Sequence, residues 1–566
     1  MADRQFDLLT EPWIRVRMVN GQVQEVSLRE LFRSAREIAG LEGESATQDN
    51  AILRMLLAVL IRAVRTTELV DQPGPVIWEE LRTMPDFGEF VGEYLDTMAD
   101  RFRLFDDQAP FYQVADLHTK KGEYPSAGVL VPDIGPGLFS TRTAEDARTL
   151  QPAEAARWLV REQAYSFSGI KTGAEGDPRV KGGKGYPIGT GWAGALGSVQ
   201  VLGPTLRDTL VLCLPLTAFT VDTHEMDRDL PPWERQPDTS APRGMDEVDP
   251  WGVVDLLTWQ QRRIRLWADD QGAVAKVMVA NGDRLRLTNQ FIEPLSGFRY
   301  SKTQSKKGVS VYFARTHDPD LTVWRGVQAL FLESGATAEG AQATDRPALV
   351  IDQLRTDPVL GDLVQQAYGS DPLGLRLVGA EYGTQSAVLV GEIEEVLRMH
   401  PVVLGRHGQD LRQEALEAVA LVMSFRGSLN WFTKQLEVCA GGSGETASLA
   451  GVHSWLSEME GAFTQWLMNL GPDRDADEAG KAWRKSMYLI TVRHIESAVQ
   501  TAGPRAAIGW MEADESSRGQ LHSSARYETW AKQKLTEVTG VRAGKAEQLV
   551  SSGTEDESHY ESEGER

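Results

Sequence analysis

The chain has 566 residues, a formal net charge of −22 at pH 7, 41% hydrophobic residues and 25% charged residues. These proportions are those of a globular protein, and they exclude collagen-like, wholly disordered and disulfide-scaffold proteins. The two cysteines, Cys213 and Cys439, are too few for a four-cysteine zinc site and are typical of a reducing compartment.

Two further exclusions concern membranes and nucleic acid. The most apolar stretch, residues 55–61, is far shorter than the roughly 20 residues needed to cross a bilayer, and the first residues lack a signal-peptide pattern. We therefore expect a cytoplasmic protein without membrane contact. Proteins that bind nucleic acid on their own usually carry net positive charge, so in this acidic chain such binding is expected to be local or shared with partner subunits.

The first part of the chain predicts a mixed α+β fold. Residues 13–26 alternate around an Asn-Gly pair, which is typical of a β-hairpin, and Ser27 begins a predicted helix. A buried helix is expected over residues 50–67. Glycines then accumulate between residues 109 and 204, which predicts long loops. Further strands are predicted at residues 210–216, 262–267, 275–280 and 309–313.

After residue 384 the pattern changes to helical periodicity. We predict a large N-terminal α+β domain over residues 1–384, an up-and-down four-helix bundle over 385–548, and a disordered acidic tail over 549–566. Helices are expected at residues 388–399, 411–438, 447–470, 477–501 and 523–539.

One stretch of the glycine-rich region is cationic. Lys181, Gly182, Gly183, Lys184 and Gly185 follow one another, and positive charge among glycines lets a phosphate or a base edge approach the backbone closely. No hydroxyl residue follows the second lysine, so the stretch is not a Walker P-loop. Two interpretations stay open: contact with nucleic acid or phosphate, and a flexible loop or linker in a purely structural scaffold.

A second cationic window covers residues 299–307. It contains Lys302, Lys306 and Lys307, no acid, and aromatic neighbours. This composition suits a phosphate backbone and a stacked base, but it also suits a solvated hairpin loop.

A third cluster consists of Arg262, Arg263 and Arg265 on a predicted strand. Successive side chains of a strand point to opposite faces, so the arginines at 263 and 265 share one face. That face is compatible with the solvated side of a sheet.

A catalytic alternative rests on His317 and Asp318, which resemble the His-Asp pair of metal-dependent phosphohydrolases. The further ligands that would complete a metal site are missing at suitable spacing, and neither Gly-x-Ser-x-Gly nor His-Glu-x-x-His occurs. We therefore expect no enzyme activity, no metal and no cofactor, with a metal-dependent nuclease or phosphohydrolase as the alternative.

Several segments, in this order, resemble one family. They are Phe-Asp-Leu-Leu-Thr-Glu-Pro-Trp-Ile at residues 6–14, Pro-Phe-Tyr-Gln at 110–113, the glycine run that ends at Gly197, and Tyr-Gly-Thr-Gln at 382–385, which opens the predicted bundle. Together they resemble the CasA family, the large subunit of the type I-E CRISPR surveillance complex Cascade. The resemblance covers nearly the whole chain, to about residue 548.

The resemblance implies a non-catalytic subunit with an α+β domain and a four-helix bundle. Members lie at the end of Cascade that holds the 5′ handle of the CRISPR RNA. They recognise the protospacer-adjacent motif (PAM) of double-stranded target DNA through the minor groove, nucleate strand separation and R-loop formation, and recruit the helicase-nuclease. The implied partners are therefore the other Cascade subunits, the CRISPR RNA, the duplex DNA and the helicase-nuclease. The two Cys-x-x-Cys pairs of some members are missing, so no zinc is implied.

The resemblance also assigns residues. Thr384 and Gln385 match the wedge that splits the first target pairs, Phe139 matches the aromatic residue that contacts the RNA handle, and Arg284 or Arg286 matches a basic finger in the minor groove. The basic window at 302–307 is expected to add further DNA contacts. The glycine loop that lies against the PAM falls within residues 182–191, and the DNA-binding residues expected there are Lys181, Gly182, Gly183, Lys184, Gly185, Gly189 and Gly191.

Overall fold

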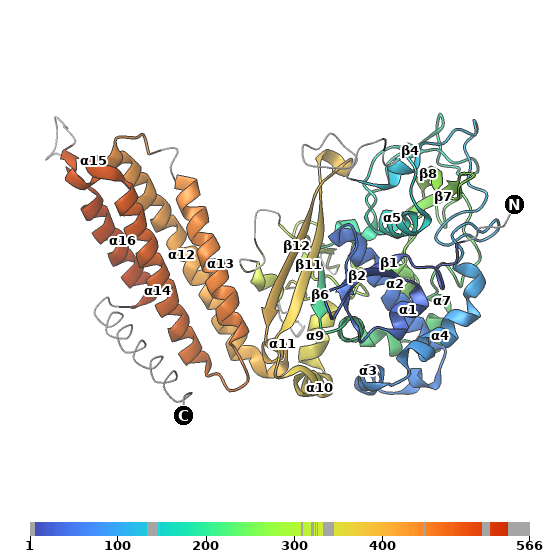
Figure 1. Cartoon of the computed structure of the whole chain (residues 1–566), viewed down its shortest axis with the longest axis horizontal. Helices are drawn as coiled ribbons and strands as arrows, with labels where there is room; N and C mark the ends of the chain where they lie inside the picture. The colour runs from blue at the N-terminus through green and yellow to red at the C-terminus, as the bar shows by residue number, and fades with distance from the viewer. Residues whose placement is uncertain are drawn as a thin grey trace, which may run out of the picture. The chain divides into compact units, whose positions relative to one another are not determined.

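A computed structural model describes residues 6–132, 145, 148–306, 309–318, 322, 324, 326–331, 344–444, 448–511 and 521–541 (Figure 1). These residues fall into two compact units. Unit 1 comprises residues 6–368 and 373–397, and unit 2 comprises residues 369–372 and 398–541.

Unit 1 mixes short strands with helices, as the sequence predicts for an α+β fold. In chain order its elements are β1 (Ile14–Met18), β2 (Val23–Val26), α1 (Leu28–Arg33), β3 (Ile38–Leu41), α2 (Ala46–Arg65), α3 (Gly74–Thr83), α4 (Phe87–Thr97), α5 (Pro152–Tyr165), β4 (Lys171–Thr172), β5 (Lys184–Gly185), β6 (Ser198–Leu202), α6 (Leu206–Leu212), α7 (Thr223–Arg228), α8 (Val253–Leu257), β7 (Arg262–Ala268), β8 (Val274–Asn281), β9 (Phe298–Tyr300), β10 (Tyr312–Ala314), α9 (Leu349–Thr356), α10 (Pro358–Tyr368), β11 (Leu373–Tyr382) and β12 (Leu389–Met399).

The strands of unit 1 form several small sheets. Two of them have three strands, in the orders β2-β1-β3 and β12-β11-β6, and β4-β5, β7-β8 and β9-β10 are antiparallel pairs. β11 pairs antiparallel with β6, with Leu375 opposite Val201. Its long hairpin with β12 therefore extends from a buried sheet.

Helix α2 forms the centre of unit 1. All of its residues except Arg62 and Arg65 are buried, and α4, α5, α6, α8 and β11 contact it. The guanidinium of Arg54 pairs with Glu293 at 2.7 and 2.8 Å, and both side chains are almost fully buried. Glu293 also accepts a hydrogen bond from Trp192 Nε1 at 2.6 Å. A buried carboxylate needs such partners, and here they join α2 to the segment that follows the glycine-rich loop.

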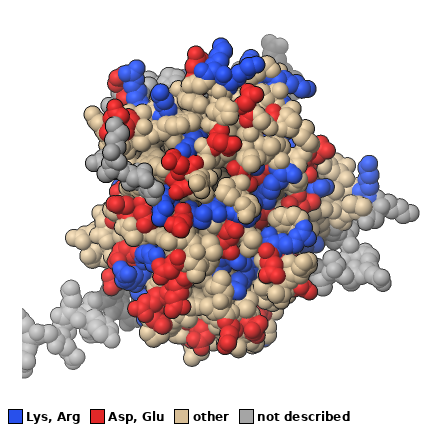
Figure 2. Space-filling model, turned by 90° about the vertical axis from the view of Figure 1, so that its right-hand side faces the viewer, with Lys and Arg blue, Asp and Glu red and all other residues tan. Residues whose placement is uncertain are grey.

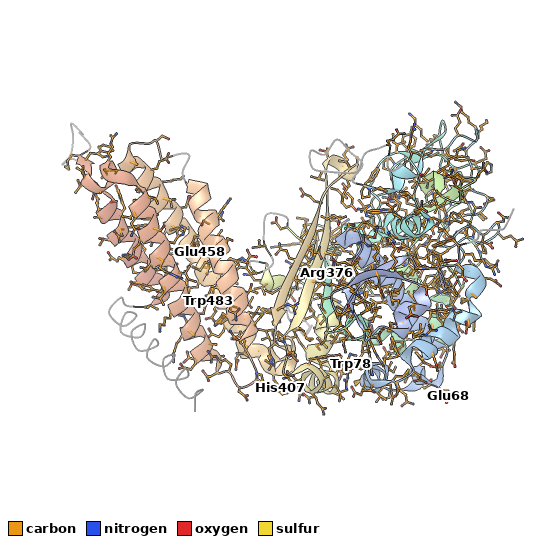
Figure 3. All side chains as sticks on the ribbon, in the orientation of Figure 1. Glu68, Trp78, Arg376, His407, Glu458 and Trp483 are labelled. Carbon is orange, nitrogen blue, oxygen red and sulfur yellow. The ribbon has the colours of Figure 1, made fainter. Side chains whose placement is uncertain are left out.

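Unit 2 is built mainly of helices. Its elements are α11 (Pro401–Leu404), α12 (Gln409–Ala440), α13 (Ser448–Met468), α14 (Ala476–Thr501), α15 (Gly503–Ile508), β13 (Trp510–Met511), β14 (Leu521–His522) and α16 (Ser524–Thr539). α12 contacts α13, α14 and α16, and α14 contacts α13 and α16 (Figure 1). The helices bury aromatic side chains between them. One of these, Trp483 (Figure 3), donates its indole N–H to Ala418 O at 3.1 Å.

Most of the elements expected from the sequence are confirmed, and three expectations are wrong. Residues 152–165, inside the stretch expected to be long loops, form the helix α5, which begins with Pro152, a residue favoured at the first helical position. Residues 210–216, expected as a strand, form none: residues 210–212 are the end of α6, which a capping box of Thr205 and Asp208 starts, and Leu216 begins a short 3₁₀ helix. Residues 388–399, expected as a bundle helix, form β12, whose β-branched residues suit a pleated strand beside β11. This stretch therefore stays in unit 1 through Leu397, past the expected boundary at residue 384.

Two remaining expectations concern the chain as a whole. Within the described ranges, no helix has the length and apolar character that a bilayer crossing requires. The tail expected over residues 549–566 lies outside the described residues.

Candidate nucleic-acid interface

The cationic glycine stretch forms an exposed β-hairpin turn. Lys181 N donates to Lys184 O at 3.1 Å, and Lys184 N donates to Lys181 O at 3.2 Å. Gly182 and Gly183, at the two central positions, have φ of +58° and +74°, as a type I′ turn requires. A Cβ at either glycine would touch nothing within 4 Å. Both lysines are exposed and make no ion pair within the described part of the chain, so the turn presents two ammonium groups and open backbone to solvent.

The inner side of this hairpin is fastened to β8. Asn281 Nδ2 donates to Tyr186 O at 2.6 Å, and a Cβ on the buried Gly185 would lie 2.9 Å from the same nitrogen. Arg179 pairs with Asp177 at 3.0 Å and donates to Asn281 O at 3.2 Å. These contacts anchor the loop to the rest of unit 1, whereas a flexible linker would lack such contacts.

A buried lysine lies beneath the hairpin. The ammonium group of Lys171 is 3.7 Å from the centroid of the Phe167 ring and 3.9 Å from Glu162 Oε1. Burial lowers the pKa of Lys171 to about 8, although Glu162 favours the charged form. Lys171 therefore serves as a packed support for the hairpin, and the exposed lysines of the turn supply its surface charge.

The second half of the glycine loop returns to the protein core. Gly189 has φ of +99°, and its carbonyl oxygen accepts a hydrogen bond from Arg262 at 2.6 Å. Gly191 N donates to Ser166 O at 2.8 Å. A Cβ on Gly191 would lie 2.3 Å from Ala164 O, so this glycine is required by a close approach to α5. The structure thus divides the predicted glycine loop into an exposed turn and a buried return.

Thr384 and Gln385 lie at the exposed tip of the β11–β12 hairpin, and not at the start of a helical bundle as the sequence predicts. The hairpin is closed by Gly383 N, which donates to Val388 O at 3.0 Å. Gln385 and Ser386 have φ of +57° and +53°. Left-handed backbone costs a residue with a side chain roughly 1–2 kcal/mol, and such strain is concentrated at functional sites.

The candidate finger residues are exposed but paired with acids. Arg284 pairs with Glu247 at 2.9 Å, and Arg286 pairs with Asp249 at 3.0 Å. About half of each arginine side chain is accessible. Their positive charge is therefore offset locally, in contrast to that of the glycine turn.

The basic window forms the connection between β9 and β10. Lys302 and Lys306 are exposed, and Lys306 exchanges two backbone hydrogen bonds with Val309 at 3.1 and 2.9 Å. Neither lysine makes an ion pair within the described ranges. Lys307 and Phe139 lie outside the described residues.

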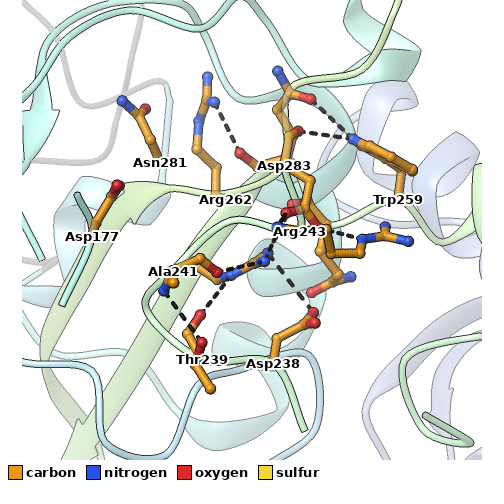
Figure 4. A network of polar contacts seen from close by, with 12 residues as sticks. Asp177, Asp238, Thr239, Ala241, Arg243, Trp259, Arg262, Asn281 and Asp283 are labelled. Carbon is orange, nitrogen blue, oxygen red and sulfur yellow. Dashed lines mark hydrogen bonds and ion pairs between the residues drawn. The ribbon is translucent and has the colours of Figure 1, made fainter. Parts of the chain in front are cut away.

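The expectation of a solvated face for Arg263 and Arg265 is wrong, because both side chains are buried, as is that of Arg262. Arg263 donates to Asp283 at 2.9 Å and to Thr239 O at 2.9 Å, and Figure 4 labels both of these acceptor residues. Burial alone would raise the pKa of Asp283, but Arg263 and Arg243 hold it below its usual value. The cluster is thus an internal polar network. The periodicity of the strand could not distinguish such a network from a solvated face.

The His317 and Asp318 pair has no metal-site geometry. His317 Nε2 lies 3.0 Å from Ser198 O, and burial lowers the pKa of the imidazole. The pair lines a cavity of about 140 Å³ with mostly apolar walls. No group of three or more potential metal ligands occurs among the described residues.

Two exposed lysines beside the glycine turn were not among the residues predicted from the sequence. Lys120 and Lys121 lie in a turn closed by Gly122 N, which donates to Thr119 O at 3.1 Å. This turn is held next to the glycine loop by Glu175 N, which donates to His118 O. The Lys-Lys-Gly triplet was a usable signal. On the face drawn in Figure 2, Lys and Arg are prominent along the upper edge, and Asp and Glu are prominent at the lower edge.

Comparison with known proteins identifies relatives over most of the chain. The family model for CRISPR-associated protein Cse1 (CRISPR_cse1) matches residues 7–493. The CRISPR-associated protein CasA/Cse1 of Thermus thermophilus is 30% identical over 281 residues, which are 47% of this chain and 50% of that protein, so the chain spans about half the length of this curated relative. The crystal structure of Thermobifida fusca Cse1 has a TM-score of 0.79 at 34% identity and covers 94% of this chain and 98% of its own. A chain of a CRISPR RNA-guided surveillance complex shares the fold, with a TM-score of 0.64 at 18% identity over 94% of this chain and 99% of that chain.

We predict that Gly191→Ala destabilises the protein, because its Cβ would collide with the carbonyl oxygen of Ala164. Overpacking of this kind costs about 1–3 kcal/mol. Urea unfolding of the purified chain measures the effect. Gly40→Ala is the matched control, since its Cβ would meet nothing within 4 Å. Equal unfolding midpoints for the two variants would contradict the close approach.

Proposed function

The chain belongs to the Cse1 family of CRISPR-associated proteins, and we propose that it is the large, non-catalytic subunit of a type I-E CRISPR surveillance complex, Cascade. In this role it recognises the PAM of double-stranded target DNA through the minor groove, nucleates strand separation and R-loop formation, and recruits the helicase-nuclease. The resemblance to the CasA family is confirmed by the family match and by the Thermobifida fusca structure.

The observation that carries this proposal is an exposed two-glycine turn on the same unit as an exposed glutamine hairpin tip. The lysines of the turn make no ion pair with any residue that the structure describes. The turn offers backbone N–H groups, two ammonium groups and no side chain at its centre. The minor groove of B-DNA is only about 6 Å wide, so a turn without side chains suits close approach to its floor. Base pairs in this groove differ mainly in the exocyclic amine of guanine, and a backbone contact there would accept several related PAM sequences.

The hairpin tip suits the next step, which is the separation of the first target pairs. Opening a base step costs a few kcal/mol, and a polar side chain held at the junction would offset part of that cost. Gln385 is exposed on a two-stranded support, and it need not read a base, because pairing with the guide RNA supplies the sequence specificity.

The acidic net charge fits a subunit that works inside a complex. Isolated lysines on the described surface suffice for a few phosphate contacts, and neighbouring Cascade subunits would supply most of the positive channel. Phe139 is proposed to contact the 5′ handle of the CRISPR RNA. The helices of unit 2 are proposed to form a four-helix bundle that completes the docking surface in Cascade.

The charge of the glycine turn is the first test. Gly183→Asn and Gly183→Asp introduce side chains of nearly equal size into open space, and both residues tolerate positive φ better than most. In Cascade reconstituted with each variant, the aspartate is expected to weaken binding of PAM-bearing duplex about fivefold or more relative to the asparagine, because it adds repulsion toward a phosphate. Band-shift titration measures this ratio. A ratio near one would remove the turn from the DNA interface.

Gln385→Ala is expected to slow R-loop opening more than it weakens binding of the PAM duplex, because the side chain lies at the hairpin tip. Opening is followed by 2-aminopurine fluorescence at the first target pairs, and binding is measured on a cross-linked duplex that cannot open. Gln385→Gly is the control for backbone strain at φ +57° and should reproduce the alanine result. Equal reductions in the two assays would contradict a wedge.

The basic window generates a salt-dependence prediction. Lys302→Gln combined with Lys306→Gln should weaken duplex binding by Cascade and reduce the slope of log K against log salt by about 2, because each lysine that neutralises a phosphate contributes roughly one to that slope. The matched control is Arg33→Gln combined with Arg82→Gln, whose charges are already paired with Glu30 and Glu79. An unchanged slope in the lysine variant would leave the window as a solvated loop.

A further inference from the structure

The C-terminal end of α5 joins the two segments that the proposed function uses. A helix leaves its last four carbonyl oxygens without partners of its own. At this end of α5 two of these partners come from distant parts of the chain: Tyr165 O accepts from Tyr382 Oη at 2.8 Å, and the O of the C-cap residue Ser166 accepts from Gly191 N at 2.8 Å. Just beyond the helix, Phe167 O accepts from Arg262 at 3.0 Å.

The glycine loop is held to this junction from two sides. Arg262, buried on β7, donates from the same nitrogen to Phe167 O and to Gly189 O. Its Nε also donates to Ser166 Oγ at 2.8 Å. Gly191 also packs directly against the backbone of Ala164 in α5, because it has no side chain to keep the loop and the helix apart.

The glutamine hairpin reaches the junction through Tyr382, which ends β11. Burial raises the pKa of this phenol, so the hydroxyl stays protonated and donates to Tyr165 O. A Cβ on Gly194 would lie 2.2 Å from the same hydroxyl, which shows how closely the phenol is packed. The hairpin tip also passes near the junction, because a Cβ on Gly169 would lie 4.0 Å from Ala387 O.

Other contacts brace the hairpin farther from its tip. Glu392 on β12 accepts a hydrogen bond from Thr47 N at the start of α2 (3.2 Å). Arg376 on β11 pairs with Asp49 of α2 at 3.0 Å (Figure 3). Tyr382 is only three residues before Gln385, so its hydrogen bond controls the tip most directly.

We propose that the C-terminal end of α5 sets the position of the Gln385 tip relative to the glycine loop, with Tyr382 as the positioning residue. This inference rests on the proposed function. A duplex held by the glycine turn then meets the hairpin tip at a defined step, and strand separation starts at a fixed distance from the PAM. Tyr382 itself touches no DNA in this arrangement.

The test is Tyr382→Phe in the full-length chain, reconstituted into Cascade. The change removes one neutral hydrogen bond and leaves the ring in place. We expect R-loop opening to slow roughly threefold to tenfold, the range that corresponds to one such bond, with unchanged affinity for a cross-linked PAM duplex. A target with a pre-melted bubble at the first target pairs should restore the normal rate of R-loop completion, since the hairpin has nothing left to open. A damaged fold would not be rescued in this way.

Tyr368→Phe is the matched control. Tyr368, the last residue of α10 in the same unit, donates its hydroxyl to Asp208 at 2.7 Å, so the change also removes one partly buried tyrosine hydrogen bond. If Tyr382→Phe behaves like Tyr368→Phe while Gln385→Ala slows opening, the positioning role is wrong and the proposed function stands. If Gln385→Ala has no effect on opening, the wedge assignment itself fails. Weaker duplex affinity in Tyr382→Phe, or absence of rescue by the bubble, would also overturn the positioning role.

Discussion

Unit 1 depends on how the terminal carbonyls of α5 find partners. Backbone polar groups at a buried helix end cannot be left unsatisfied without a cost of about 1–3 kcal/mol each, and water has little access here. The chain meets this requirement with a phenol from β11 and a glycine amide from the glycine loop, and a guanidinium from β7 binds the Ser166 hydroxyl and Phe167 O directly after the helix. One local constraint thereby places three segments that are far apart in the sequence.

Arginine and lysine are used differently in this acidic protein. Arginines such as Arg54, Arg262 and Arg263 are buried, where the planar guanidinium satisfies several carbonyls or a carboxylate at once. Lysines such as Lys181 and Lys184 stay exposed, and they have no acidic partner among the described residues. The positive charge available to a nucleic acid is therefore a small part of the total and lies on a few turns. This distribution explains how a chain of net charge −22 can still present a local cationic surface.

The two candidate contact elements share a backbone feature. Gly182 and Gly183 adopt positive φ without cost, whereas Gln385 and Ser386 adopt it against the preference of their side chains. The difference matches their proposed tasks. A turn that lies in a narrow groove benefits from having no side chains, and a tip that separates bases needs one. The strain at the tip is held by the strands on either side and by the anchoring of Tyr382.

The sequence by itself determined the family, the α+β character of unit 1, most helices of unit 2 and the residues of the glycine turn, because these depend on local periodicity, turn chemistry and ordered motifs. Only the tertiary structure decided the roles of residues whose local pattern is ambiguous. The strand alternation that predicts a solvated face for Arg263 is equally compatible with a buried polar network. Only folding brings a partner such as Asp283 next to Arg263. Residues 388–399 carry both helical and strand signals, and pairing with β11 selects the strand. The junction of Tyr165 with Tyr382 has no signature in the sequence, since a hydrogen bond between residues 217 positions apart is set by packing alone.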